Sequence, residues 1–424
     1  MSKINIPYGK GSVTIDIPED KLAGLLVSQA HDYKKTGTEA EIVQKALDNP
    51  VHSRPLKELV QGKKRIVIIS SDHTRPVPSH VTMPLILSEI RRGNPQADIT
   101  ILVATGYHRL TTLDELKNKY GAEIVAGEKI VVHNAFDDEA MVDLGILPSG
   151  GSLKLNKLAL DTDLLIAEGF IEPHFFAGFS GGRKSVLPGI ASAATVMANH
   201  CAAFIASPQA RSGLLAGNPI HTDMIYAAEK AGLAFILNVV IDAEKKVIQA
   251  FAGHFNDAHV AGCEFVKELA GVKAVPADIV ITSNGGYPLD QNIYQAVKSM
   301  AAAEASCKPG GVIIIFSQCA DGHGGEAFYN TFAEAKDVDG IHQDIVKRLA
   351  CDTVADQWES QILSRILLKH EVIMITEAPR EMVETMFMKW APDLETALQM
   401  AYDKIDAESA KITVIPDGVA VIVL

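Results

Sequence analysis

Short apolar runs of strand length alternate along this chain with segments of helical periodicity. Residues 65–70 and 98–104 form two such runs, and a helical pattern from about residue 79 to residue 92 separates them. Further runs occupy residues 164–167 and 312–316. Strands that alternate with helices are typical of a parallel, doubly wound sheet. The sequence therefore predicts an α/β fold with mainly parallel, Rossmann-like sheets.

The chain length of 424 residues is sufficient for two domains. The pattern changes near residues 271–276, where a new strand–helix unit begins. We expect an N-terminal α/β domain over residues 1–270 that carries cofactor and acid/base residues. A C-terminal α/β domain over residues 271–424 would contribute substrate-binding residues, with the active-site crevice between the two. The pattern also predicts an opening hairpin around residues 8–11 and a final hairpin over 411–423. The final hairpin could pack back on the N-terminal domain.

The composition excludes several classes of partner. The net charge of −13 argues against nucleic acid and anionic membrane, because both reward clustered cations. The first twenty or so residues lack the apolar core of a signal peptide. The five cysteines are scattered without a CxxC pair, as is common for reduced thiols. We expect a cytoplasmic protein that binds neither nucleic acid nor membrane.

Polar side chains follow the expected strands of the first half directly. They are Asp72-His73-Thr74-Arg75, Tyr107-His108 and Glu172-Pro173-His174. Ligands of open α/β sheets bind outside the carboxyl ends of the strands, so these groups predict a site. His108 and His174 are candidates for an acid/base pair, although each alone is more readily a satisfied polar residue than a catalyst. Arg75 lies in a Thr-Arg-Pro-Val-Pro loop whose two prolines limit its backbone freedom, so it suits a carboxylate or phosphate, but an ion pair with Asp72 is an open alternative.

The densest feature is the glycine-rich run over residues 172–189. It nearly matches a Walker A motif, with Gly178 and Lys184-Ser185 in place, but Arg183 stands where that motif has glycine. The run predicts a phosphate-binding loop. A turn-rich surface loop is the simpler alternative, and a nucleotide-dependent phosphotransferase is a distant functional one.

Other candidate residues are ambiguous by themselves. His200 is either a metal ligand or a polar group at a helix end. Gln295 and Lys298 share one helix face, which is usually solvated. Trp358 is most simply a core or interface aromatic.

Taken together, these segments resemble the nickel-pincer lactate racemase family. The similarity runs from the first expected hairpin to the last, and the glycine-rich run is its most specific part. The matching stretches are residues 70–78, 104–108, 170–190, 198–200, 284–298, 321–326 and 356–358.

The resemblance implies a nickel-pincer nucleotide cofactor, the Ni(II)-pyridinium-3,5-bisthiocarboxylate mononucleotide. In such a protein Lys184 can hold the cofactor covalently, and the thioamide of this link then lies at the metal. His200 is a further metal ligand. His108 and His174 are the implied catalytic residues. The implied cofactor-binding residues are Asp72, His73, Thr74, Arg75, Gly178, Lys184, Pro188 and His200. The implied substrate-binding residues are Arg75, Tyr294, Gln295, Lys298 and Trp358.

The implied activity is that of an isomerase, which interconverts D- and L-lactate by proton-coupled hydride transfer through pyruvate. Removal of the Cα hydrogen as hydride avoids a carbanion beside a carboxylate, but no amino acid supplies the acceptor. Imidazole suits the transfer of the hydroxyl proton near neutral pH. Another short 2-hydroxy acid as substrate, and a nickel storage or delivery role, are the alternatives. The implied partners are the 2-hydroxy acid and the enzymes that build the cofactor.

Overall fold

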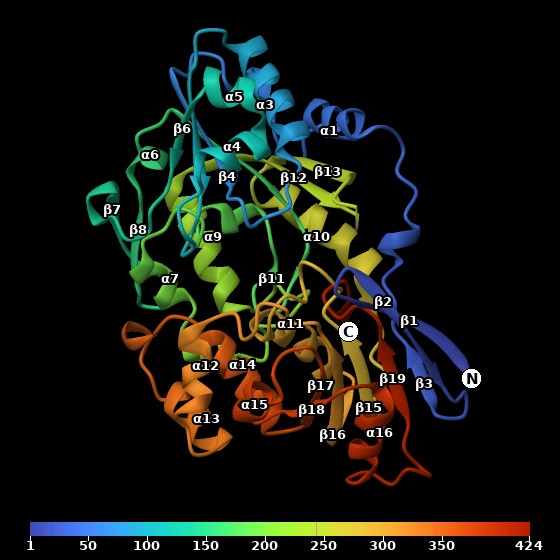
Figure 1. The fold of residues 1–424 in the computed structure, drawn as a ribbon. Coiled ribbons are helices and arrows are strands. Elements are labelled where there is room, and N and C mark those ends of the chain that lie inside the picture. The colour runs from blue at the N-terminus through green and yellow to red at the C-terminus, as the bar shows by residue number, and fades with distance from the viewer. Residues whose placement is uncertain (243) are drawn as a thin grey trace. The chain divides into compact units, whose positions relative to one another are not determined.

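The computed structural model describes residues 1–242 and 244–424, which fall into two compact units (Figure 1). The N-terminal unit comprises residues 30–200 and 209–269. The C-terminal unit comprises residues 1–29, 201–208 and 270–424. Each unit has its own parallel sheet, so the expected α/β class with two mainly parallel sheets is confirmed.

The N-terminal unit contains a six-stranded sheet of order β13-β12-β9-β4-β5-β6, in which only β13 is antiparallel to its neighbour. The chain enters at β4, runs outward through β5 to β6, and then returns to β9 on the other side of β4. The strand order therefore reverses between β4 and β9, which is where open α/β sheets bind ligands. The strands are β4 (Arg65–Ser71), β5 (Asp98–Ala104), β6 (Lys129–Val132), β9 (Leu164–Phe170), β12 (Leu233–Ile241) and β13 (Val247–His254).

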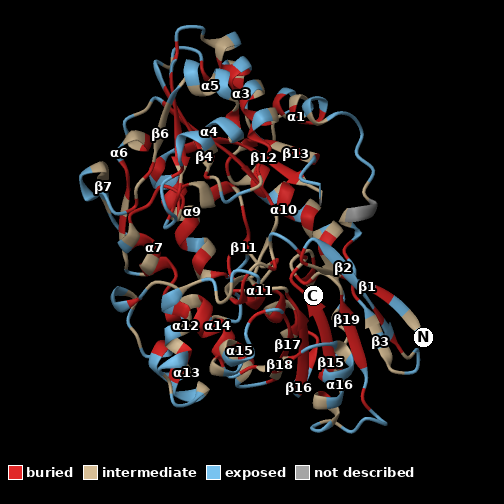
Figure 2. Cartoon of the chain, in the orientation of Figure 1, coloured by how far each residue is buried: buried red, intermediate tan, exposed pale blue. Residues whose placement is uncertain are grey.

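The central strands β4, β5 and β9 are buried on both faces, as parallel strands covered by helices are (Figure 2). Ile68, Ile101 and Ile166 belong to one hydrophobic cluster with Ile86 and Ile90 of α3. The helices are α1 (Glu39–Asp48), α2 (Leu56–Leu59), α3 (Ser79–Gly93), α4 (Leu113–Tyr120), α5 (Ala122–Gly127), α6 (Lys157–Leu160), α7 (Ala193–Asn199), α9 (Pro219–Ala231) and α10 (Asp257–Ala270). Two small hairpins complete the unit, β7 (Met141–Ile146) with β8 (Ser152–Asn156), and β10 (Pro173–His174) with β11 (Gly178–Phe179).

The C-terminal unit contains an all-parallel sheet of order β18-β17-β16-β15-β19-β3. Its strands are β3 (Leu22–Leu25), β15 (Ala277–Ser283), β16 (Cys307–Phe316), β17 (Glu371–Ile375), β18 (Lys389–Ala391) and β19 (Ile412–Ile415). Its helices are α8 (Ala202–Ala206), α11 (Ile293–Glu304), α12 (Glu326–Ala333), α13 (Val338–Val346), α14 (Gln357–Leu367), α15 (Arg380–Thr385) and α16 (Leu394–Tyr402). Strand order reverses between β15 and β19, and α11 follows β15 in the chain.

The opening hairpin is confirmed, but it belongs to the C-terminal unit rather than to the expected 1–270 domain. Strands β1 (Ser2–Tyr8) and β2 (Gly11–Ile17) pair in antiparallel register. Ile6 and Ile17 lie in one hydrophobic cluster with Ile281 and Ile314 of the C-terminal sheet. Helix α8 also differs from the expected boundaries, because Gln361 donates a hydrogen bond to the carbonyl of Ala202 at 2.9 Å.

The predicted final hairpin is wrong. Strand β19 lies between β15 and β3 and is parallel to both. Strand β20 (Ile422–Val423) instead pairs in parallel with β14 (Gly271–Val272), which is also in the C-terminal unit. All of β19 is buried, so its apolar run is that of a central parallel strand and not of a half-exposed hairpin.

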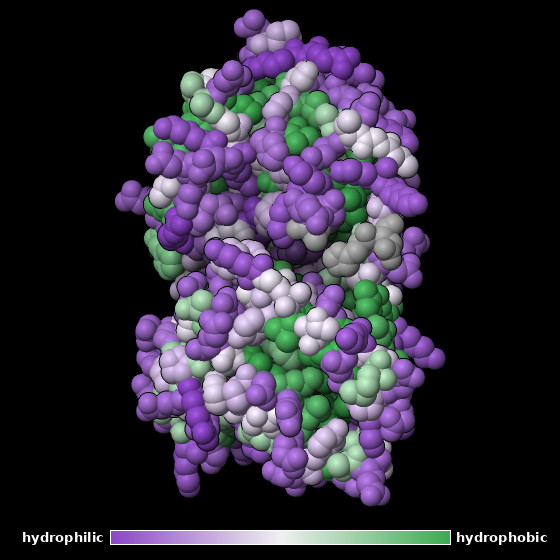
Figure 3. Space-filling view, turned by 45° about the vertical axis from the view of Figure 1, so that its right-hand side comes forward, coloured by the Kyte–Doolittle hydropathy of each residue, from purple (hydrophilic) through white to green (hydrophobic). Residues whose placement is uncertain are grey.

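Within the described ranges, no helix is long and apolar enough to cross a membrane. Figure 3 shows hydrophilic residues over most of the face in view, with hydrophobic residues in patches between them.

We predict that Ile6→Ala destabilises the C-terminal unit by about 2–5 kcal/mol, because a fully buried side chain is removed from the contact between hairpin and sheet. Urea denaturation measures the effect. Val13→Ala, which truncates a 38% exposed residue opposite Ile6, is the matched control and should cost less than about 1 kcal/mol. Equal losses from both variants would contradict the packing of this hairpin.

Candidate active site

Three adjacent strand ends of the N-terminal unit carry the candidate residues. Strand β4 leads into Asp72, β5 leads to the loop of His108, and β9 leads to His174. Because β4 lies between β5 and β9, the strands that lead to the two histidines are two interstrand spacings apart, about 10 Å. All three ends lie at one edge of the sheet, at the reversal of strand order described above.

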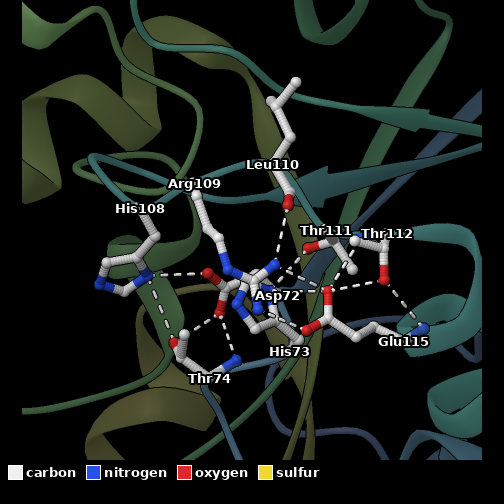
Figure 4. A network of polar contacts seen from close by, with 9 residues as sticks. All are labelled: Asp72, His73, Thr74, His108, Arg109, Leu110, Thr111, Thr112 and Glu115. Atoms are coloured by element: carbon white, nitrogen blue, oxygen red, sulfur yellow. Dashed lines mark hydrogen bonds and ion pairs between the residues drawn. The ribbon is translucent and has the colours of Figure 1, made fainter.

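Asp72 and His108 form a hydrogen-bonded pair (Figure 4). Oδ2 of Asp72 lies 2.7 Å from Nδ1 of His108. The other carboxylate oxygen, Oδ1, accepts hydrogen bonds from the backbone N–H of Thr74 at 3.1 Å and from its hydroxyl at 2.7 Å. The sequence left an ion pair between Asp72 and Arg75 open; in the structure Asp72 is hydrogen-bonded to His108 and Thr74, and the charge of Arg75 also acts on it. Arg75 is exposed at this edge.

The carboxyl of Asp72 is buried yet remains ionised. Burial alone would raise its pKa, but the hydrogen bond and charge of His108, the Thr74 hydroxyl and the charge of Arg75 together lower the pKa below its ordinary value. Asp72 is therefore an acceptor near neutral pH.

A second set of contacts anchors the loop that carries His108 (Figure 4). Nδ1 of His73 lies 3.0 Å from the hydroxyl of Thr111. Glu115 accepts from Arg109 at 2.5 and 2.9 Å and from the backbone N–H of Thr112 at 2.8 Å, which caps α4. The predicted cofactor residue His73 thus supports the loop of His108 in this unit.

His174 lies in the β10–β11 hairpin, where Phe176 brings three candidate residues together. The Phe176 ring is 4.5 Å from the ring of His174 and 5.2 Å from that of His200, both edge to face. Nζ of Lys184 lies 5.9 Å from the centre of the same ring. Nδ1 of His174 accepts a hydrogen bond from the backbone N–H of Ala177 at 3.3 Å.

His200 is held as a neutral imidazole. Its Nδ1 lies 3.0 Å from the carbonyl oxygen of Val196, so Nδ1 carries the proton and Nε2 carries the lone pair. Burial, together with the charge of Lys184, lowers the pKa of His200 to about 3. A neutral ring with this tautomer is the form in which histidine binds a metal.

The glycine-rich run is organised around Arg183, which is completely buried. The guanidinium donates to the carbonyls of Ala177 at 2.7 Å and Phe179 at 2.8 Å, and its Nε donates to Nδ1 of His221 at 3.0 Å. Burial lowers the pKa of Arg183 to about 10, so it is still a cation near neutral pH. Burial and the charge of Arg183 lower the pKa of His221 to about 3, which keeps that acceptor neutral.

The phosphate-binding loop stays a prediction, but much of the backbone that would form it is already hydrogen-bonded within the protein. Many backbone N–H groups of the run already donate within the protein, namely those of Ser180, Gly182, Lys184, Val186, Leu187 and Gly189. Gly178 has φ +79°, and a Cβ there would lie 2.3 Å from the carbonyl oxygen of Leu214. This glycine therefore allows the run to pack on its own unit. A Walker A loop joins a strand to a helix, whereas this one continues into a 3-10 turn, Gly182–Ser185.

Pro188 lies against the turn that precedes His108. The backbone N–H of Gly106 donates to the carbonyl of Gly189 at 3.0 Å. A Cβ at Gly106 would lie 3.5 Å from the carbonyl oxygen of Pro188. The end of the glycine-rich run and the loop of His108 therefore support one another.

The substrate-binding candidates of the C-terminal unit form a separate cluster on α11 and α14. Nζ of Lys298 donates to Oε1 of Gln295 at 2.6 Å. The indole N–H of Trp358 donates to the hydroxyl of Tyr294 at 3.2 Å, and that hydroxyl donates to Asp356 at 3.2 Å. Gln295 and Lys298 are both only partly exposed, and Trp358 makes a directed polar contact.

Sequence reasoning missed two buried carboxylates. Glu168 on β9 accepts from the hydroxyls of Ser70, at 2.5 Å, and Thr82. Glu359 on α14 is completely buried, and its oxygens have no hydrogen-bond partner among the described residues. Burial raises the pKa of Glu359, while the charge of Lys298 acts in the opposite direction. The sequence could have indicated Glu168, because a glutamate within the apolar run of β9 is unusual. It gave no indication of the burial of Glu359, because a glutamate in a helix is ordinarily exposed.

Among the described residues, no group of three or more histidine, cysteine or acidic side chains is arranged to hold a metal ion.

A histidine–carboxylate pair at the reversal point of a parallel sheet is the arrangement of an α/β enzyme. The lactate racemase N-terminal domain family matches residues 8–213, and the lactate racemase C-terminal domain family matches residues 272–423. The chain belongs to the lactate racemase family.

Similar proteins extend over the whole chain. A protein named lactate racemase from Thermoanaerobacterium thermosaccharolyticum is 58% identical over 100% of this chain and 99% of its own. Another lactate racemase, from Lactiplantibacillus plantarum, is 54% identical over 100% of both chains. The solved structure of the Thermoanaerobacterium lactate racemase apoprotein superposes with a TM-score of 0.97, at 57% identity over 100% of both chains. A Thermotoga maritima protein with 20% identity and a TM-score of 0.64 over 91% of this chain and 98% of its own shares the fold.

We predict that Arg183→Met destabilises the N-terminal unit by at least about 3 kcal/mol, because several buried carbonyls lose their donor. Urea denaturation of the apoprotein measures the loss. Arg65→Met is the matched control, since Arg65 is half exposed and pairs with Asp161 at the surface, and it should cost less than about 1 kcal/mol. A small effect of Arg183→Met would mean that the guanidinium does not hold the run together.

Proposed function

We propose that this protein is an isomerase that interconverts D- and L-lactate by proton-coupled hydride transfer through pyruvate, with a nickel-pincer nucleotide as cofactor. The observation that carries the proposal is the pair of histidines at the carboxyl ends of β5 and β9, on either side of the strand that leads to Asp72. The names of the two relatives, at 58% and 54% identity, support lactate as the substrate. Another short 2-hydroxy acid is the alternative, because a hydrophobic contact distinguishes one methylene by only about 1–3 kcal/mol.

The residues around Phe176 fit the proposed cofactor. Lys184 is a primary amine that can form an amide-type link, and it lies close enough to His200 for its charge to lower that residue's pKa. His200 is neutral, with its lone pair on Nε2, and so can donate to nickel. When bound, the pyridinium ring supplies a hydride acceptor, which no side chain provides.

The nucleotide part would be bound mainly by side chains. Since many N–H groups of the glycine-rich run donate within the protein, we assign the phosphate to the exposed Arg75. Thr74 would hold the loop that carries Arg75, because its N–H and its hydroxyl both donate to Asp72. Gly178 and Pro188 would shape the loops around it. Asp72 and His73 would contribute to the same site by holding these loops in place.

His108 and His174 would move the hydroxyl proton of the substrate, one for each enantiomer. Planar pyruvate can be reduced on either face, so a second imidazole is needed for the opposite product. Arg75 or Lys298 would hold the carboxylate while the groups on Cα rearrange. Tyr294, Gln295 and Trp358 would complete substrate binding in the C-terminal unit.

The alternatives have less support. A P-loop phosphotransferase needs a Walker A loop that opens an α-helix, whereas this run has an inward-facing arginine and a short 3-10 turn. A nickel storage or delivery protein would be expected to show histidine- or cysteine-rich tracts. The proposal also retains the cytoplasmic location and the enzymes that build the cofactor as partners.

We predict that His108→Ala and His174→Ala each lower the turnover of lactate at least about 10²-fold, since each removes one proton-transfer group. Chiral chromatography of the products from each enantiomer measures turnover by the cofactor-loaded protein, and nickel content reports the loading. His52→Ala, at a side chain that is 78% exposed, is the matched control and should keep full activity. Undiminished racemisation by the His108/His174 double variant would overturn the acid/base assignment.

We predict that Lys184→Ala loses most of the bound cofactor, because the amine that would tether it is gone. Intact mass and nickel content of protein from a host that makes the cofactor measure retention. Lys157→Ala, at an exposed lysine of the same unit, is the control and should retain the cofactor. Equal loading of both variants would argue against the tether, while leaving racemisation open.

A further inference from the structure

The two candidate histidines present their Nδ1 atoms to groups of opposite hydrogen-bonding character. Nδ1 of His108 lies 2.7 Å from a carboxylate oxygen of Asp72. Nδ1 of His174 lies 3.3 Å from the backbone N–H of Ala177. Because a neutral imidazole has one N–H and one lone pair, these contacts determine which nitrogen carries the proton.

The contacts of His108 require a proton on Nδ1. Asp72 is ionised and can only accept. The hydroxyl of Thr74, 3.3 Å from the same Nδ1, already gives its one proton to Oδ1 of Asp72 at 2.7 Å. Both neighbours of Nδ1 are therefore acceptors, and the lone pair of neutral His108 is on Nε2.

Other charged groups near this pair favour the same state. Arg75, Arg109 and Lys119 all lie close enough to Asp72 for their charges to interact with it. Tyr120 is a further titratable group, and burial raises its pKa, so it stays neutral. Three cations around one buried carboxylate keep that carboxylate ionised.

The contact of His174 requires the opposite tautomer. A backbone N–H can only donate, so Nδ1 of His174 carries the lone pair. The proton of neutral His174 is then on Nε2. The antiparallel pairing of His174 with Gly178 in the β10–β11 hairpin fixes the loop from which Ala177 donates.

We propose that Asp72 is a positioning residue, and that Asp72 and the Ala177 backbone hold His108 and His174 in opposite tautomers. Nε2 of His108 accepts a proton, while Nε2 of His174 donates a hydrogen bond. The inference deepens the proposed function and rests on it only in assuming that both Nε2 atoms contact the substrate.

The two enantiomers then begin their reactions differently. Where the hydroxyl meets His108, its proton would move to Nε2 as the C=O bond forms and the Cα hydrogen leaves as hydride, for which the bound pyridinium would be the acceptor. Where the hydroxyl meets His174, it meets an N–H. The ring must first exchange tautomers through water, releasing the Nε2 proton and taking one on Nδ1 with loss of the Ala177 hydrogen bond, before Nε2 can act as a base. Steady-state kcat/KM stays equal for the two enantiomers, which have the same free energy, but the first turnover is slower for one of them.

Substitution of Asp72 by asparagine should reverse the tautomer of His108. Oδ1 of Asp72 accepts two hydrogen bonds from Thr74. An amide at position 72 keeps its oxygen toward these two donors and turns its NH₂ group toward His108. Nδ1 of His108 must then accept, and the proton moves to Nε2.

The experiment is ¹⁵N NMR of histidine-labelled, cofactor-loaded protein at a pH where both rings are neutral, with signals assigned from His108→Gln and His174→Gln. We expect a protonated Nδ1 for His108 and a protonated Nε2 for His174. Asp72→Asn should exchange the two nitrogen signals of His108, leave those of His174 unchanged, and lower kcat at least about 10²-fold. Glu115→Gln is the matched control, because it changes a carboxylate of the same network that does not contact His108, and it should leave the tautomers unchanged.

A wild-type His108 with its proton on Nε2, or a His174 with its proton on Nδ1, overturns the inference. Unchanged His108 signals in Asp72→Asn overturn the role of Asp72. The NMR result does not depend on turnover. If the protein has the expected tautomers but racemises no 2-hydroxy acid, the proposed function is wrong and the tautomer assignment still holds.

Discussion

A completely buried guanidinium holds the segment from which several candidate residues project. Arg183 binds the carbonyls of Ala177 and Phe179, so a run rich in glycine acquires one conformation. Lys184 follows Arg183 directly. Phe176, which contacts the rings of both His174 and His200, directly precedes Ala177, whose carbonyl Arg183 binds. The guanidinium of Arg183 therefore stabilises the fold of the run. The cation that lies in the candidate site is the adjacent Lys184.

The same edge of the sheet contains buried carboxylates that hold neighbouring side chains in place. Asp72 is buried and is satisfied by His108 and Thr74. Glu168 on the adjacent strand accepts from Ser70 and Thr82. Polar groups that are removed from water need partners with good geometry, and a fully satisfied network of this kind is rigid. Such rigidity is what a proton-transfer site requires, since small changes in orientation decide which nitrogen faces the substrate.

Much of the fold could be predicted from the sequence, because parallel strands leave long apolar runs with polar residues at their carboxyl ends. The strand at residues 98–104 has the predicted bounds, and His108 and His174 follow the predicted strands. The final hairpin could not be predicted correctly, since the run at 412–415 does not reveal that its neighbours are β15 and β3. The inward direction of Arg183 was equally hidden, because it depends on carbonyls that converge only after folding.

The pairing of β3 with β19 has a consequence for biosynthesis. Leu22 and Ile412 are register partners, so β3 waits for a strand that is made about 390 residues later. On the ribosome, residues 30–269 can close their own sheet while the first hairpin still lacks its apolar support, and its isoleucines remain in contact with water until strands of the C-terminal sheet emerge. Truncation of either terminus should therefore expose the same apolar surface, and chaperone dependence should follow completion of the chain and not its beginning.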